Sequence, residues 1–169
     1  MACEASWAFA TTSMLSDRIR IARNGSFPDV ILSPQLLLDC DLDDNGCDGG
    51  SPWDALQWIF ENRLTDETCA PYRGYGKSNG RICLESSRCL SCLQTGECFI
   101  PPAYPSYGIA EFGMLAGKDD VMREVHGRGP VACLVDFPTD FMRYRGGVYL
   151  NNVSNPRAGS PQAVELVGW

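Results

Sequence analysis

Nucleophilic catalysis by this chain would depend on His126, because the sequence contains a single histidine. A serine or cysteine nucleophile needs a nearby base, usually histidine, to take its proton. His126 lies in residues 117–130, which the pattern predicts to be an amphipathic helix with Met122 and Val125 inward and Gly127 just past its end. A histidine in the last turn of a helix interacts favourably with the helix dipole. We therefore expect a structural role for His126, with catalysis as the alternative.

The sequence contains nine cysteines, whose spacing suits either zinc binding or disulfide formation. Cys83, Cys89, Cys92 and Cys98 surround one C-x-x-C, and four thiolates can form a tetrahedral zinc site. The paired C-x-x-C of common zinc modules is missing, however, and zinc would leave the remaining cysteines unexplained. So many cysteines in a short chain favour disulfides in an oxidising compartment. We expect no metal and no cofactor.

Composition limits the size of the fold and the kinds of partner. The 169 residues can bury a core of their own, as one domain or as two small lobes. A net charge of −7 argues against a nucleic acid or an anionic membrane surface as partner. No apolar run approaches the roughly 18 residues that a membrane span needs. Asn24 and Asn152 each begin an N-glycosylation triplet, which agrees with secretion.

The first half of the sequence is predicted to be helical. Residues 6–22 form one expected helix, which ends before an Asn-Gly pair. Two further helices are expected to begin at Ser33-Pro34 and Ser51-Pro52, because serine caps a helix and proline suits its first turn.

The second half of the sequence changes character. Residues 69–105 are rich in Cys, Gly, Ser and Pro and are predicted to be a disulfide-stapled loop region. Helices followed by strands predict an α+β fold with a mainly helical lobe over residues 1–105 and a mainly β lobe over 106–169. The expected strands are residues 131–137, 147–150 and 163–167.

The run Cys3-Glu4-Ala5-Ser6-Trp7-Ala8-Phe9 resembles the nucleophile segment of papain-like cysteine peptidases, a Cys-Gly-Ser-Cys-Trp run. Gly46-Cys47-Asp48-Gly49-Gly50-Ser51-Pro52-Trp53 is similar to the Gly-Gly segment of the same family. The segments 112–117, 129–133 and 167–169 are most similar to the cathepsin X (cathepsin Z) branch of the family. The resemblance covers nearly the whole chain and implies a papain-like fold of two lobes.

The resemblance also implies that the catalytic positions are substituted. The nucleophilic cysteine of the family falls on Ser6, and counting back from Gly168-Trp169 places its catalytic histidine on Gln162. Glutamine has no ionisable side chain and cannot act as a general base at neutral pH. The family's oxyanion-hole glutamine falls before Met1, and the asparagine that orients its histidine falls beyond Trp169.

The family pattern assigns a substrate cleft as well. In the family the second glycine of the pair, here Gly50, bonds an extended substrate backbone, and the region after Pro52 floors a specificity pocket. Paired glycines let a backbone approach a ligand closely. We expect the cleft to be lined by Trp7, Gly49, Gly50, Pro52 and Trp53.

Resemblance to cathepsin X further implies a disulfide pattern. Cys133 is left single in an expected apolar strand, where an inert buried thiol is more typical than a nucleophile. The implied pairs are Cys3–Cys47, Cys40–Cys83, Cys69–Cys89 and Cys92–Cys98.

Together these features predict a catalytically inactive, cathepsin X-like protein with a structural or binding role in a secretory or lysosomal lumen. A protein or peptide partner is expected, and the chain suits a subunit of a larger assembly. In the family further segments precede Cys3 and follow Trp169, so the sequence looks like an excerpt, with an unpaired edge at residues 163–167. The alternatives are a weak hydrolase using Ser6, a peptidase whose histidine lies elsewhere, and a fragment completed by another chain.

Overall fold

The computed structural model describes residues 3–76, 83–150 and 160–169. Within them, none of the helices is long and apolar enough to span a membrane. The sequon at Asn152 lies outside the described residues, whereas Asn24 is exposed in the turn after the first helix. The elements follow the order α1 (Ser6–Ala22), α2 (Pro34–Cys40), η1 (Gly46–Asp48), α3 (Pro52–Asn62), α4 (Glu85–Arg88), β1 (Ser91–Cys92), β2 (Cys98–Phe99), α5 (Lys118–Arg128), β3 (Val131–Phe137), η2 (Thr139–Arg143) and β4 (Ser160–Leu166).

The predicted starts of the first three helices are confirmed. The Ser33 hydroxyl accepts a hydrogen bond from the backbone N–H of Leu36, and the Ser51 hydroxyl accepts one from Trp53. Both caps satisfy a donor that the helix itself leaves unpaired, and each is typically worth about 1 kcal/mol. α1 covers the expected residues and begins at Ser6.

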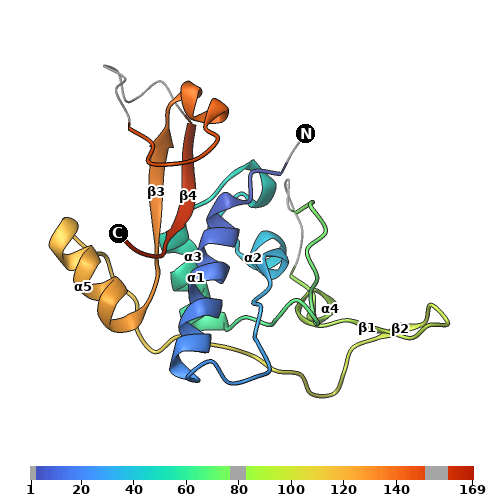
Figure 1. Ribbon diagram of the computed structural model, residues 1–169. Helices are drawn as coiled ribbons and strands as arrows, with labels where there is room; N and C mark the ends of the chain where they lie inside the picture. Colours follow the sequence, from blue (N-terminus) through green and yellow to red (C-terminus); the bar gives the residue numbers. More distant parts are fainter. Residues whose placement is uncertain (1–2, 77–82, 151–159) are drawn as a thin grey trace.

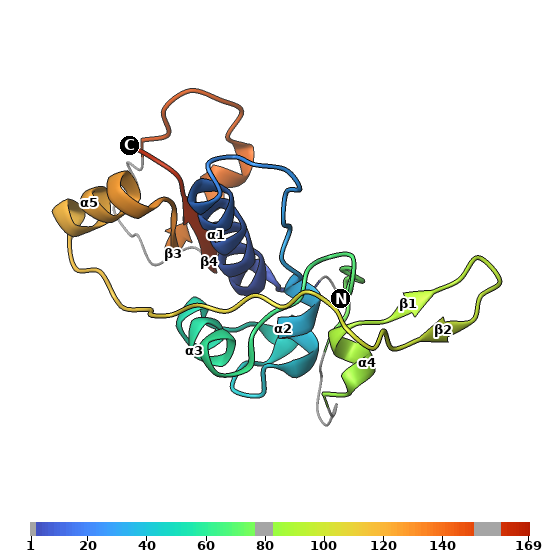
Figure 2. The ribbon, with the colours of Figure 1, turned by 90° about the horizontal axis from the view of Figure 1, so that it is seen from below.

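Helix α1 is the central element of the molecule. It contacts α2 and α3 on one side and the β3–β4 sheet on the other, an arrangement visible in Figures 1 and 2. Fully burying a large apolar side chain contributes roughly 1.5–3 kcal/mol. Most of the core lies where α1 meets α2 and α3. Its largest fully buried apolar side chains are Trp7, Leu36, Leu37, Leu38, Ile59 and Leu64.

Strands β3 and β4 pair antiparallel along their full length, from Val131 opposite Leu166 to Phe137 opposite Ser160. This confirms the strand predicted at 131–137 and moves the start of the last strand three residues earlier than expected. The strand predicted at residues 147–150 is wrong. Gly147 has a positive φ of 82°, and the segment lies exposed, so its apolar residues have no sheet face to cover.

Helix α5 runs two residues further than the sequence indicates. Gly127 lies inside it, Arg128 is its last residue, and Gly129 caps it with a φ of 104° that suits glycine. Val121, Met122 and Val125 form the half-buried face, and His126 is exposed in the last turn.

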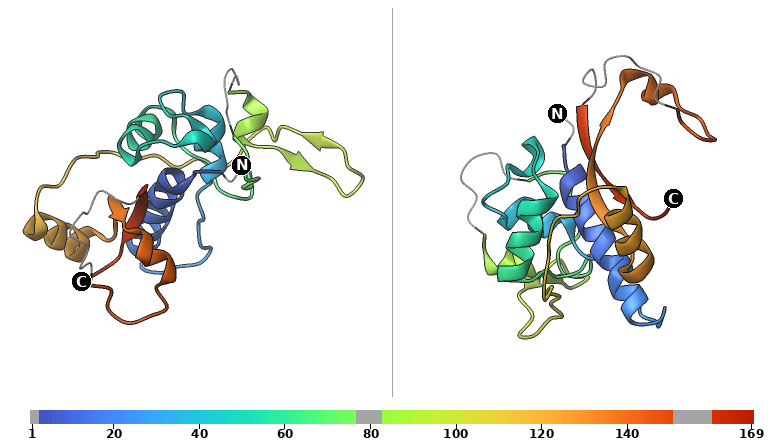
Figure 3. Two further views of the ribbon diagram at one scale, coloured as in Figure 1. Left: turned by 90° about the horizontal axis from the view of Figure 1, so that it is seen from above. Right: turned by 90° about the vertical axis from the view of Figure 1, so that its left-hand side faces the viewer.

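Four disulfides stabilise the chain, and the pairs are those that the family resemblance implied: Cys3–Cys47, Cys40–Cys83, Cys69–Cys89 and Cys92–Cys98. The four cysteines of the zinc alternative are thus divided among three bonds. Within the described residues, no group of side chains is placed to hold a metal ion. The last disulfide closes the β1–β2 hairpin, which projects from the body in Figure 1 and in the left view of Figure 3.

Loop length predicts how much each disulfide contributes to stability. Replacing Cys3 and Cys47 by serine should lower the free energy of unfolding by about 4 kcal/mol, because their bond closes a long loop. Replacing Cys92 and Cys98 should lower it by about 2 kcal/mol, because their sequence separation is only 6 residues. Urea unfolding without reductant measures both, and a larger loss for the short loop would contradict the prediction.

Candidate functional site

Ser6 lies where the N-terminus of α1 meets strand β4. Its hydroxyl oxygen accepts a hydrogen bond from the backbone N–H of Ala163 at 3.3 Å. The side chain is half-buried, and no side-chain cap precedes it at Ala5. The backbone amide fixes the hydroxyl oxygen but cannot take its proton, because an N–H group is itself a donor.

Gln162 is the residue next to Ala163, so the structure brings Ser6 and Gln162 to neighbouring positions although they are far apart in sequence. It lies half-buried on β4, opposite Val135 of β3. Its side-chain amide donates and accepts hydrogen bonds but stays neutral near pH 7. Among the described residues, the hydrogen bond of the Ser6 hydroxyl is thus to a backbone amide, and neither that amide nor Gln162 can act as a base.

His126 does not lie at this site. Helix α5 contacts the far half of α1, where the Arg18 guanidinium bonds Glu124 at 3.0 Å and the carbonyl oxygen of Gly129 at 3.2 Å. Arg18 is about 18 Å from Ser6 along the helix axis, at 1.5 Å per residue. The exposed His126 side chain extends from this distant helix, so the Ser–His alternative has no geometric support.

Gly50 leaves no room for a side chain. A Cβ atom there would lie 2.6 Å from the Trp7 ring and 2.6 Å from Asp44 Oδ1. Trp7 is buried beneath it, and its indole N–H donates to the carbonyl oxygen of Gly46 at 3.1 Å. Trp7 was expected to line the cleft, but it supports the Gly49–Gly50 segment from below instead.

The remaining expected cleft residues differ in exposure. Pro52 is buried in the first turn of α3, Gly49 is half-buried, and the Trp53 side chain is exposed. The Trp53 ring packs against Phe112, with ring centroids 5.0 Å apart. Trp53 therefore forms the edge between the Gly49–Gly50 segment and a neighbouring hollow.

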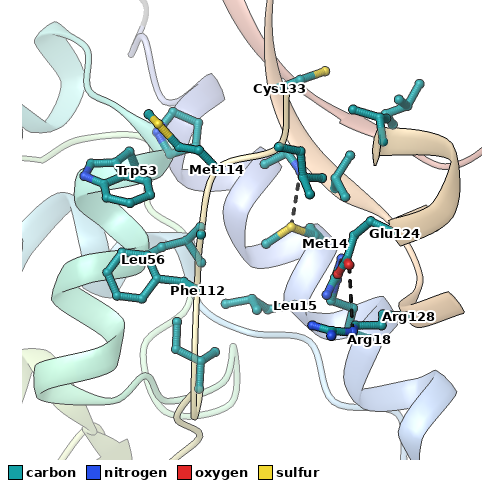
Figure 4. Close-up of a pocket in the computed structure, with 18 of the residues that line it drawn as sticks. Met14, Leu15, Arg18, Trp53, Leu56, Phe112, Met114, Glu124, Arg128 and Cys133 are labelled. Carbon is teal, nitrogen blue, oxygen red and sulfur yellow. Dashed lines mark hydrogen bonds and ion pairs between the residues drawn. The ribbon is translucent and has the colours of Figure 1, made fainter. Parts of the chain in front are cut away.

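That hollow has a volume of about 800 Å³ and lies between α1, α3, α5, β3 and residues 109–115. Figure 4 shows Trp53, Leu56 and Phe112 along one wall and the ion pair of Arg18 with Glu124 on the other. Cys133, the free cysteine among the described residues, also borders it, and burial raises the pKa of its thiol. The higher pKa keeps Cys133 in the unreactive thiol form.

Two buried acids lie beneath the Gly49–Gly50 segment. Asp41 is 0% exposed and Asp44 is 3% exposed, and the charge of Asp41 acts on the carboxyl group of Asp44. Burial raises the pKa of Asp44 to about 7, and the charges of Asp41 and Asp54 add to the shift against the opposing Ser51 N–H. Burial also raises the pKa of Asp41.

Sequence reasoning missed this pair. The acids stand in the polar run Asp41-Leu42-Asp43-Asp44-Asn45, whose composition is typical of a solvated loop. No local pattern distinguishes the buried carboxylates from their exposed neighbour Asp43. The only available signal was the pair of flanking cysteines, Cys40 and Cys47, which tie the loop to the core.

The fold and the α1–β4 site together define a class of protein. The sequence profile described as papain family cysteine protease matches residues 1–169, and the chain belongs to that family. This confirms both the resemblance stated from the sequence and the α+β, papain-like fold.

Particular relatives narrow the comparison. The chain is 33% identical to cathepsin Z of Onchocerca volvulus over 147 residues, covering 87% of this chain and 46% of the relative. It is 31% identical to a tubulointerstitial nephritis antigen-like protein of Homo sapiens, covering 99% of this chain and 39% of that protein. The solved structure of procathepsin B S9 from Trypanosoma congolense superposes with a TM-score of 0.71 at 28% identity, covering 99% and 54%. The chain thus spans about half or less of the length of these relatives.

The packing at Gly50 predicts the result of a substitution. Gly50→Ala should lower the free energy of unfolding by about 1–3 kcal/mol, because the new methyl group must displace Trp7 or Asp44. Gly113→Ala is the matched control, since a Cβ there meets nothing within 4 Å and should change stability by less than about 0.5 kcal/mol. Thermal or urea unfolding measures both, and equal effects would refute the packing argument.

Proposed function

We propose that this protein is a catalytically inactive member of the papain family that binds an extended peptide or protein segment. The observation that supports the proposal is the α1–β4 junction, where the Ala163 N–H donates to the Ser6 hydroxyl beside Gln162. The family resemblance assigns Ser6 and Gln162 to the positions of nucleophile and base. A serine hydroxyl is not ionised near neutral pH and requires a base to attack a carbonyl. Neither Gln162 nor the Ala163 amide supplies one.

The magnitude of the loss supports inactivity. Removal of either the nucleophile or the histidine of a catalytic triad reduced kcat roughly a million-fold in subtilisin. Both positions are substituted here, and two separate substitutions fit a naturally inactive protein better than a single trapping mutation does.

The peptide-binding part of the proposal rests on the cleft segment. Gly50 is exposed, and its lack of a side chain leaves the backbone open to an approaching strand. Main-chain hydrogen bonds to an extended peptide give affinity without any catalytic group. We further propose that residues 1–105 and 106–169 act as the two lobes on either side of this cleft.

A protein partner is proposed for the β3–β4 region. A two-stranded sheet is marginally stable in water by itself. Leu134 is exposed on β3, and Val167 and Trp169 are exposed just after β4. A large exposed apolar surface is typical of an interaction site, and we propose that these side chains contribute to one. We expect residues 1–169, expressed alone, to self-associate, whereas a monomeric and cooperatively folding product in size-exclusion chromatography would remove the need for a partner.

The compartment proposed for this protein is a secretory or lysosomal lumen. Four disulfides indicate an oxidising environment. The exposed Asn24 is accessible for glycosylation there.

The natural protein is expected to cleave no peptide substrate and to remain unlabelled by thiol-directed active-site probes. The reason is that position 6 carries a hydroxyl and not a thiol, and that neither Gln162 nor the Ala163 amide can take its proton. Fluorogenic peptides and a biotinylated probe measure both properties, with an active papain-family protease as the positive control.

A matched variant keeps the prediction open to refutation. Turnover that disappears in Ser6→Ala would identify a serine hydrolase and overturn the proposal. Turnover that survives Ser6→Ala would identify a contaminating protease, which leaves the natural protein inactive as expected.

A further inference from the structure

The Asp41–Asp44 pair is built into the support of the cleft segment. Asp41 directly follows α2, where its backbone N–H bonds the carbonyl oxygen of Leu37 at 3.0 Å. Asp44 Oδ1 accepts a hydrogen bond from the backbone N–H of Ser51 at 2.7 Å, which fixes the residue just before α3. The Asp44 carboxyl group therefore connects the middle of the loop between α2 and α3 to the residue that caps α3.

The same carboxyl group contacts the peptide-facing residue. Asp44 Oδ1 and the Trp7 ring both lie where a Cβ of Gly50 would be. Gly50 thus packs directly on Asp44 and on the indole, and a shift of Asp44 must move Gly50 or Ser51. Disulfides at Cys40 and Cys47 hold the ends of the loop, so any movement is confined to the residues between and just beyond them.

We propose that the Asp41–Asp44 pair is a pH-sensitive support of the cleft, which holds the Gly49–Gly50 segment at acidic pH and loosens it toward neutral pH. The link to peptide binding rests on the function proposed above. In an acidic lumen the Gly49–Gly50 segment is ordered and able to bind a peptide. At neutral pH the segment is loosened and the peptide is released.

The electrostatic environment sets the direction of the switch. Asp43 in the same loop and Asp54 on α3 both act on the pair with negative charge, while α1 faces it with the uncharged Trp7 ring. When both carboxyl groups are ionised, two like charges lie in a buried site, where their repulsion is strong. Separation of the two carboxyl groups then moves Ser51 and Gly50.

The sign follows from the pKa of Asp44 in the folded and open states. The folded pKa is about 7, above the ordinary value of 3.8. The folded loop therefore keeps a proton that the open loop loses between about pH 4 and 7. The stability of the closed loop is fully present below about pH 4, falls as the pH rises through that window and levels off above about pH 7.

Hydrogen–deuterium exchange tests the proposal without any peptide. In the natural protein with its disulfides intact, protection of the amides at residues 45–51 should fall by up to about a hundredfold between pH 5 and pH 8, after correction for intrinsic exchange rates. Amides of α2 serve as the internal reference and should change much less.

Asp44→Asn is the decisive variant, because asparagine keeps an acceptor for the Ser51 N–H but cannot ionise. It should abolish the pH dependence, whereas Asp119→Asn, an exposed acid on α5, should preserve it. If Asp44→Asn does not fold, Asp44→Ser serves the same purpose, because a serine hydroxyl is also an acceptor that does not ionise in this pH range. Unchanged protection between the two pH values, or a pH dependence that persists in a folded Asp44 variant, would overturn the proposal.

Peptide binding is measured separately at the same two pH values, with a library of extended peptides. Binding that is stronger at pH 5 supports the switch and the proposed function together. If amide protection depends on pH but no peptide binds at either pH, the result supports the switch and counts against the proposed peptide-binding function.

Discussion

The packing of the Trp7 indole is the contact on which the rest of this structure depends. It fills the core between α1 and the loop that precedes α3, and its single polar atom is satisfied by Gly46. An indole N–H buried without a partner would cost about 1–3 kcal/mol, so this hydrogen bond fixes the loop relative to the helix. Gly50 and Asp44 then pack on the same ring. Core, cleft segment and buried acids therefore form one connected unit.

Stability and catalysis are separable in this fold. The core of α1, α2 and α3 and the four disulfides make no use of the Ser6 hydroxyl or of the Gln162 amide. The Ser6 hydroxyl even gains a backbone hydrogen bond from Ala163 that joins β4 to α1. A site grafted on a fold can lose its chemistry while the fold persists.

Local sequence signals predicted the elements that depend on local interactions. The Ser-Pro pairs at 33–34 and 51–52 fixed two helix starts, and the apolar run at 131–137 fixed a strand, because capping and periodicity are properties of neighbouring residues. The strand expected at 147–150 failed because its apolar residues have no described sheet to cover. Family resemblance, not periodicity, located Ser6 and Gln162. The burial of Trp7 and of Asp44 could not be predicted, since both depend on contacts across the fold.

The close packing of Gly50 on Trp7 has an evolutionary consequence. The two residues are needed to keep the α1 junction intact, whether or not any substrate is turned over. Selection for a folded protein alone would then retain Trp7 and Gly50, whether or not hydrolysis is also under selection. Across related chains, these two motif positions report the ancestry of the scaffold and carry no information about whether it hydrolyses a substrate.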